Sequence, residues 1–155
     1  MSTQEIRLTQ HVAASVEDVW AILTDIAHAD ENLSGIEAVE LLSPGPYSVG
    51  FRWRETRKMM GMRVTEEMEV TAVEPLRRSE VTAKNGEVTY RTVHSLVEKP
   101  GGTDLVMEFG MEMPAKRGIT RLMNAAMAKV GFSAMRKVME QDLQDIAAAA
   151  ELRHG

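Results

Sequence analysis

The clearest pattern in the chain is the stretch MRVTEEMEVTA at residues 62–72. Val64, Met68 and Val70 alternate with charged and hydroxyl-bearing residues, which is the spacing of a β-strand with one apolar and one polar face. Glu66 falls on the apolar face, where its neighbours are all hydrophobic. The stretch therefore predicts a long strand that carries a carboxylate on its inward side.

Similar period-two patterns continue on both sides of this stretch. They predict further strands over residues 6–12, 36–42, 49–58, 76–84, 87–98 and 104–113. Turn-forming residues such as Asn85-Gly86 and Pro100-Gly-Gly102 separate the later strands, and the connections are short. Because short connections join antiparallel neighbours, we expect one antiparallel sheet of seven strands.

Helical spacing is found at the two ends of the sheet region. Ser15-Val-Glu-Asp18 has the form of a capping box before a short helix, and a second short helix is predicted over residues 26–33. From residue 116 to residue 152 the pattern is helical to the end. Its apolar stripe consists of Ile119, Leu122, Met123, Ala126, Met127, Val130, Ala134, Val138, Leu143, Ile146 and Ala150.

These elements predict an α+β fold. Each strand has one apolar face, so the sheet needs a single covering layer, and the long terminal helix can supply it. We expect a curved seven-stranded antiparallel sheet wrapped on a long C-terminal helix, with two short helices between strands 1 and 2. A sheet that curls around one helix leaves space between the two layers, which is the physical origin of a cavity. With 155 residues and no linker or repeat, residues 1–155 are expected to form a single domain.

Composition narrows the function. The chain has no cysteine, which excludes disulfides, thiolate metal sites and a cysteine nucleophile. Its formal net charge is −5 and no basic stripe is found, so we do not expect nucleic-acid binding. The absence of a signal-peptide layout and of any apolar run of bilayer length favours a cytoplasmic protein without stable membrane insertion. The histidines are scattered along the chain, and we expect neither a metal nor another cofactor.

Three segments carry a resemblance to a known family. They are HVAASVEDVW at residues 11–20, LVEKPGGT at residues 96–103, and the end of the terminal helix at residues 143–151. With them, nearly the whole chain resembles the START-like superfamily, also called SRPBCC or helix-grip proteins, and within it the polyketide cyclase/dehydrase and lipid-transport group. Ala14 stands where that group often has proline. These motifs form a strand-to-helix corner and a tight turn, so they predict the fold better than the activity.

The resemblance implies a site for a hydrophobic small molecule or lipid in a hydrophobic cavity between sheet and helix. The ligands of a Rieske-type centre are missing, which excludes an oxygenase centre. The family pattern also turns Leu96 inward, and Tyr90 and His94 share its parity. The residues expected to bind the ligand are Trp53, Glu66, Met68, Tyr90, His94, Met107, Phe109, Met111, Met123, Met127 and Val130.

Glu66, His94 and Tyr90 are the candidate catalytic residues. An enclosed Glu66 carboxylate has a raised pKa and can act as an acid, a base or a hydrogen-bond anchor, whereas a strand bulge or a place at the cavity mouth removes that role. A buried His94 can exchange protons, and the Tyr90 hydroxyl can orient a ligand carbonyl. The alternative is that both are core polar groups with satisfied hydrogen bonds.

Two further features have alternative interpretations. Arg52, Arg54, Arg57 and Lys58 form a basic run that is either a solvated strand face or a site for an anionic ligand head. The chain also has 12 methionines, a flexible residue that fills irregular apolar space. Those near the sheet–helix gap either fill the cavity or border an empty space.

Three functional hypotheses result. In the first and preferred one, the chain is a monomeric or homodimeric carrier or sensor that holds an apolar or amphipathic small molecule, such as a lipid or a polyketide-like compound. In the second, it is a cyclase or dehydratase whose acid and base come from a Glu66–His94 pair. In the third, it is an interaction module whose cavity is filled.

Overall fold

The structure is a computed structural model that describes the backbone of residues 2–59, 61–85, 87–113 and 119–154, and the side chains of residues 5–59, 61–84, 87–112, 131 and 133–153. Its seven strands form one antiparallel sheet in the order β1-β7-β6-β5-β4-β3-β2. The strands are β1 (Ser2–Val12), β2 (Ile36–Leu41), β3 (Arg52–Met59), β4 (Met62–Glu74), β5 (Arg78–Asn85), β6 (Val88–Lys99) and β7 (Gly102–Met113). The predicted helix-grip topology is confirmed.

The helical elements are α1 (Val16–Thr24), the 3-10 turn η1 (Ile26–His28), α2 (Ala29–Asn32) and α3 (Ile119–His154). The Ser15 hydroxyl accepts a hydrogen bond from the backbone N–H of Asp18, as the capping box predicts. The second short helix is two single turns, η1 and α2, rather than one continuous helix. Residues 116–118, predicted as helix, and Gly86 of the predicted hairpin turn lie outside the described residues.

Two strands begin clearly later than the alternating pattern indicates: β5 begins at Arg78 rather than at Leu76, which has a φ of +66°, and β3 shows the larger difference. The pattern starts at residue 49, but β3 begins at Arg52. The reason is local, because Gly50 adopts a φ of +94°, which an extended strand cannot contain. The backbone N–H of Gly50 donates to the carbonyl of Val70, which holds this turn against β4.

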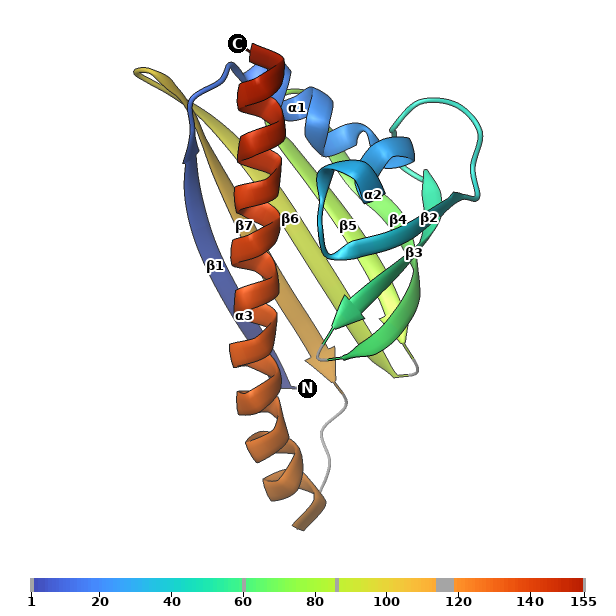
Figure 1. Ribbon diagram of the computed structural model, residues 1–155. Coiled ribbons are helices and arrows are strands. Elements are labelled where there is room, and N and C mark those ends of the chain that lie inside the picture. Colours follow the sequence, from blue (N-terminus) through green and yellow to red (C-terminus); the bar gives the residue numbers. More distant parts are fainter. Residues whose placement is uncertain (1, 60, 86, 114–118, 155) are drawn as a thin grey trace.

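The sheet curls around α3 (Figure 1). Helices α1 and α2 lie beside α3, over the part of the sheet away from β1. Helix α3 runs along the β1–β7 side and contacts β1, β7 and α1. On the opposite side, β2 and β3 bend toward the helix layer, and α2 packs against β2. Because the sheet is curved, the middle strands β4 to β6 face the interior but lie farther from α3 than β1 and β7 do (Figure 1).

The described core has two parts. The larger lies where α3 and α1 meet β1, β7 and β6, and its fully buried members include Val12, Val19, Leu105 and Met139. The smaller part contains Phe51, Trp53 and Val70, on β4 and at the start of β3. On α3 the described buried positions are Met139, Asp142, Leu143, Ile146, Ala147 and Ala150. Leu143, Ile146 and Ala150 of the predicted stripe are therefore buried. Val138 is only half-buried, and the next residue, Met139, is buried instead.

Candidate ligand pocket

A pocket of about 350 Å³ lies between the two parts of the core. Strands β3 to β7 supply most of its wall, helices α1, η1 and α2 one side, and α3 another. The helical lining is mainly apolar and includes Ile22, Leu23, Ile26, Ala29, Met135 and Ile146. The pocket is the interior space that the curled sheet leaves beside its helix.

Strand register determines which residues form the sheet wall. Trp53, Met68, Ala83 and Tyr90 are direct cross-strand partners in turn, so they form one row across β3, β4, β5 and β6. A parallel row joins Ser79, His94 and Met107 across β5, β6 and β7. Direct partners in an antiparallel sheet place their side chains on the same face. Residues that are far apart in the chain thus converge on one wall.

Glu66 keeps the inward parity that its sequence position indicates. The register shift in β4 lies between Val70 and Ala72, beyond Glu66, so residues 64–68 alternate regularly. The direct partner of Glu66 on β3 is Glu55, and both side chains line the pocket. Two carboxylates therefore occupy opposed positions on the same wall, an arrangement that disfavours charge on both.

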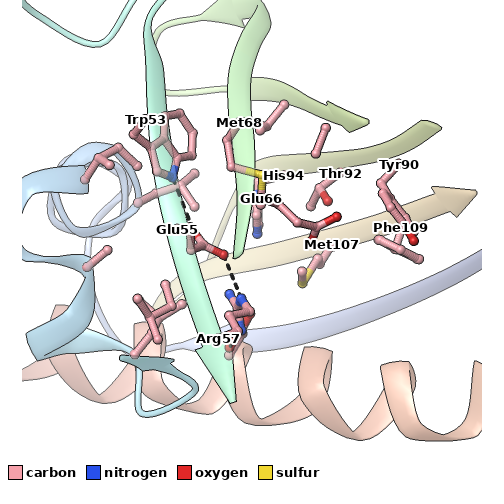
Figure 2. Close-up of a pocket in the computed structure, with 18 of the residues that line it drawn as sticks. Trp53, Glu55, Arg57, Glu66, Met68, Tyr90, Thr92, His94, Met107 and Phe109 are labelled. Atoms are coloured by element: carbon pink, nitrogen blue, oxygen red, sulfur yellow. Dashed lines mark hydrogen bonds and ion pairs between the residues drawn. The ribbon is translucent and has the colours of Figure 1, made fainter. Parts of the chain in front are cut away.

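Most residues predicted to bind a ligand lie around this pocket (Figure 2). Those in its lining are Trp53, Glu66, Met68, Tyr90, His94, Met107 and Phe109. Met111 packs beside it against the larger core and is not part of the lining. The side chains of Met123, Met127 and Val130 lie outside the described residues. Whether any of these residues binds a ligand stays a prediction.

A buried ionic cluster crosses one side of the pocket. Arg57 donates from Nε to Glu55, 2.7 Å away, and from Nη1 and Nη2 to the two carboxylate oxygens of Asp142, at 3.1 and 2.8 Å. The indole N–H of Trp53 donates to the second carboxylate oxygen of Glu55 at 3.3 Å. Figure 2 shows Glu55 between Trp53 and Arg57 along β3. The side chains of Asp142 and Glu55 are only 6% and 8% exposed, so both carboxylates are largely removed from solvent.

The charges in this cluster do not balance, because one guanidinium meets two carboxylates. Burial acts to lower the pKa of Arg57, but the charges of Asp142 and Glu55 outweigh it and hold that pKa above its ordinary value. Burial raises the pKa of the Asp142 carboxyl, and the Arg57 charge opposes the rise. Arg57 thus stays charged and is fully engaged in holding its two partners.

The other polar groups of the pocket are less constrained. Burial first, and then the charge of Glu55, raise the pKa of Glu66, while Arg57 opposes them. Burial and the charge of Glu66 raise the pKa of the Tyr90 hydroxyl. The Tyr90 ring stacks on Phe109 with centroids 6.0 Å apart. Among the described residues no hydrogen bond joins Glu66 to His94, so they do not form a direct acid–base pair.

His94 is the most unusual polar residue of the pocket. Burial, and then the charge of Arg57, lower its pKa to about 4, so its imidazole is neutral near pH 7. Within the described part of the chain, its Nε2 is a buried side-chain nitrogen with no hydrogen-bond partner. The residue as a whole is only partly buried, and it belongs to the pocket lining. A buried nitrogen without a partner is uncommon in folded proteins and calls for an explanation.

Glu55 and Asp142 were not among the predicted site residues, and Arg57 was named only within the basic run. The alternation of β3 contains the signal, because Glu55 and Arg57 share the parity of Trp53. The basic run is therefore split. Arg52 and Arg54 form exposed ion pairs with Glu67 and Glu40, and Arg57 turns inward. Asp142 lies three residues after Met139 and four before Ile146, on the buried stripe of α3, which marks it as an inward acid.

The described residues contain no group of three or more His, Cys, Asp or Glu side chains arranged to hold a metal ion. No described helix has the length and apolar character needed to cross a membrane.

Fold and pocket together define a helix-grip protein with a pocket between its sheet and its helices. A comparison with family profiles agrees: the chain belongs to the polyketide cyclase / dehydrase and lipid transport family, whose profile matches residues 3–151. The resemblance inferred from the sequence is thereby confirmed. Among curated proteins, no sequence matches the chain.

Several solved structures have the same fold at low sequence identity. TTHA0849 from Thermus thermophilus is 18% identical with a TM-score of 0.80, over 98% of this chain and 100% of that one. The Zhui aromatase/cyclase from Streptomyces sp. R1128 is 19% identical with a TM-score of 0.80, over 98% and 96%. The di-domain aromatase/cyclase BexL, from the BE-7585A biosynthetic pathway, is 18% identical with a TM-score of 0.76, over 96% of this chain and 50% of that one. At these identities the likeness shows a shared fold.

Proposed function

We propose that this protein binds an apolar or amphipathic small molecule in the pocket, as a carrier or sensor. The observation that carries the proposal is an open pocket whose lining is largely apolar and contains a few polar side chains, Glu66, Tyr90 and His94 among them. These side chains can donate or accept hydrogen bonds, so they can orient a bound hydroxyl, carbonyl or amide. The volume of about 350 Å³ is within the range of small-molecule sites.

A filled interior has less support. The described methionines of the lining, Met59, Met68, Met107 and Met135, border the pocket, and open volume remains between them and the opposite wall. Met is a side chain that adapts its shape to different apolar partners. This favours a ligand site over an interaction module with a solid core.

A second candidate function is a cyclase or dehydratase reaction in the same pocket. Its specific support is that Glu66, with a raised pKa, and His94, neutral near pH 7, line one pocket together with Tyr90. A protonated Glu66 is able to donate a proton to a leaving hydroxyl, and a neutral imidazole is able to accept one from carbon. Aromatase/cyclase activity is what the names of two structural neighbours state for those proteins.

Native mass spectrometry of freshly purified protein tests the binding proposal first. Retention of an apolar small molecule, released on denaturation, is the expected result. Titration follows with the Trp20→Phe variant, in which Trp53 of the pocket wall is the single tryptophan reporter. Binding of neutral two- and three-ring aromatic compounds is expected to change Trp53 emission in a saturable way. If no ligand is retained and no compound of this kind saturates the signal, the binding proposal is wrong.

Turnover distinguishes the enzyme from the carrier. For a dehydratase, incubation with a β-hydroxy ketone yields a product with a mass lower by one water. For a cyclase, a linear poly-β-ketone yields a cyclic aldol product of unchanged mass but different chromatographic retention, or its dehydrated form, which is lighter by one water. Glu66→Gln should then abolish product formation while ligand binding persists. Binding without any product favours the carrier or sensor.

A further inference from the structure

The described residues that line the pocket carry more acidic groups than basic groups. Among the described lining residues, Arg57 is the one Lys or Arg, and Glu55 and Asp142 already occupy its guanidinium from two sides. Glu66 adds a further carboxyl directly opposite Glu55, whereas the lining residue Asp25 is paired with His28 at 2.9 Å. The pocket therefore has acidic groups in excess and no free cation among its described residues.

His94 does not change this balance. It lines the pocket as a neutral group, and the nearby Arg57 charge opposes its protonation. It offers hydrogen bonds to a ligand but no positive charge. Arg52 and Arg54 cannot contribute either, because their side chains lie on the outer face of β3 in exposed ion pairs.

A ligand with an anionic end would lose its hydration in this pocket and find no counter-ion among the described lining residues. Burying an unpaired charge is costly, and nearby like charges in a low-dielectric interior increase the cost. A neutral hydroxyl or amide has partners in Glu66, Tyr90 and His94, which lie along one wall in Figure 2. A cationic end has a further partner in the Glu66 carboxylate.

We propose that the pocket selects ligands whose polar end is neutral or cationic, such as phenols, ketones, amides or amines, and discriminates against carboxylates such as fatty acids. The inference rests on the proposed binding function and narrows its ligand class. It follows from two observations. Glu55 and Asp142 already bind the guanidinium of Arg57, and Glu66 lies opposite Glu55 in the pocket wall.

Three probes of nearly the same shape test the inference. They are 2-naphthamide, 2-naphthamidine and 2-naphthoate, which share one ring system and carry a neutral, a cationic and an anionic planar end. Dissociation constants are measured at pH 7.5 by isothermal titration calorimetry and by Trp53 emission. We expect the amide and the amidine to bind at least about tenfold more tightly than the carboxylate.

Two variants identify the source of the discrimination. Glu66→Gln removes a pocket carboxylate and should tighten naphthoate binding and weaken naphthamidine binding, each by about tenfold. Glu67→Gln is the matched control, since Glu67 is the next residue of β4, faces outward and is half exposed. It should leave all three dissociation constants unchanged.

The outcomes separate the two proposals. If none of the three probes binds and no ligand is retained in native mass spectrometry, the binding function itself fails. If naphthoate binds the unaltered protein as tightly as naphthamide, binding stands and the charge selectivity is overturned. Far-UV circular dichroism checks the fold of both variants; should Glu66→Gln fail to fold, the naphthoate-to-naphthamide ratio of the unaltered protein decides alone.

Discussion

At the scale of single residues, His94 is expected to affect both stability, through its buried nitrogen, and binding, as a side chain of the pocket lining. An unsatisfied buried polar atom costs about 1–3 kcal/mol, so His94→Phe, which replaces the imidazole by an apolar ring, should leave the free energy of unfolding unchanged or raise it by about 1 kcal/mol. The same change should weaken binding of 2-naphthamide by about tenfold and leave binding of naphthalene, which has no polar end, unaltered. Urea denaturation and ligand titration measure the two effects. A variant that is less stable and binds 2-naphthamide as before would contradict this role.

The same residue predicts a pH dependence with a definite sign. The folded-state pKa of His94 is about 4, against an ordinary value of 6.5. Between these values the unfolded chain binds a proton that the folded chain does not, so the folded state loses stability as pH falls from about 6.5 to 4. Relative to His94→Phe, the unaltered protein should lose roughly 2–3 kcal/mol across this window.

Comparison of the two proteins isolates the histidine, because Arg57, Glu66 and Asp142 line the pocket in both. Urea unfolding at pH 7.5, 5.5 and 4.5 gives the difference at each pH. A difference that stays constant with pH would show that His94 titrates normally in the folded state.

At the scale of elements, the Arg57–Asp142 bridge connects β3 to α3 across the pocket. Removing one partner of a buried ion pair leaves unpaired buried charge, so Arg57→Met should lower the free energy of unfolding by about 3–5 kcal/mol. Arg54→Met is the matched control on the same strand, where an exposed pair with Glu40 contributes at most about 1 kcal/mol. Equal losses for the two variants in urea unfolding would show that the bridge is not structural.

Two of the three sequence motifs that carry the family resemblance meet at a second contact between elements. The Thr103 hydroxyl donates to the carbonyl of Ala14 at 2.8 Å, and a Cβ added to Gly102 would lie 2.0 Å from the carbonyl oxygen of Val12. The obstructing atoms belong to the backbone of Val12 and Ala13, so only glycine fits at the start of β7. The tight turn and the strand-to-helix corner are thus one packed unit.

This contact predicts different costs for two neighbouring glycines. Gly102→Ala should destabilise the protein by about 3 kcal/mol or more, because the backbone of β1 must shift. Gly101 has a φ of +80° but open space around it, so Gly101→Ala should cost only about 1–2 kcal/mol. Thermal unfolding of the two variants measures the ranking, and a greater loss for Gly101→Ala would contradict the packing argument.

Local alternation made most of the elements predictable, and long-range pairing explains what it missed. The inward position of Glu66 follows from its own strand, and β4 has no bulge before Val70 to reverse it. Arg57 looked like a member of a solvated basic run because its partner Asp142 lies 85 residues away on another element. Sequence spacing gives the face of a residue but not its distance from residues on other strands or helices. The volume of the pocket and the unpaired state of His94 depend on those distances, so they required the structure.

At the scale of the whole molecule, α3 is held from both sides while the centre stays open. The larger core attaches it to β1 and β7, and the Arg57–Asp142 bridge attaches it to β3. The backbone N–H and hydroxyl of Ser34 donate to Asp145 at 2.9 and 2.8 Å, which attaches it to the segment before β2. These contacts stabilise a sheet that is closed on its helix without the interior being filled.

An open centre predicts opposite responses to added volume at two alanines that are equally buried. Ala83 and Ala147 are each 6% exposed, but Ala83 lines the pocket whereas Ala147 packs in the larger core. Ala83→Leu extends into open space, so it should keep or raise the free energy of unfolding while reducing affinity for 2-naphthamide at least about tenfold. Ala147→Leu adds the same atoms to a packed region and should cost about 1–3 kcal/mol with no comparable loss of affinity. Urea denaturation and calorimetric titration of both variants decide the matter, because a pocket that is truly part of the core would make Ala83→Leu the more damaging change.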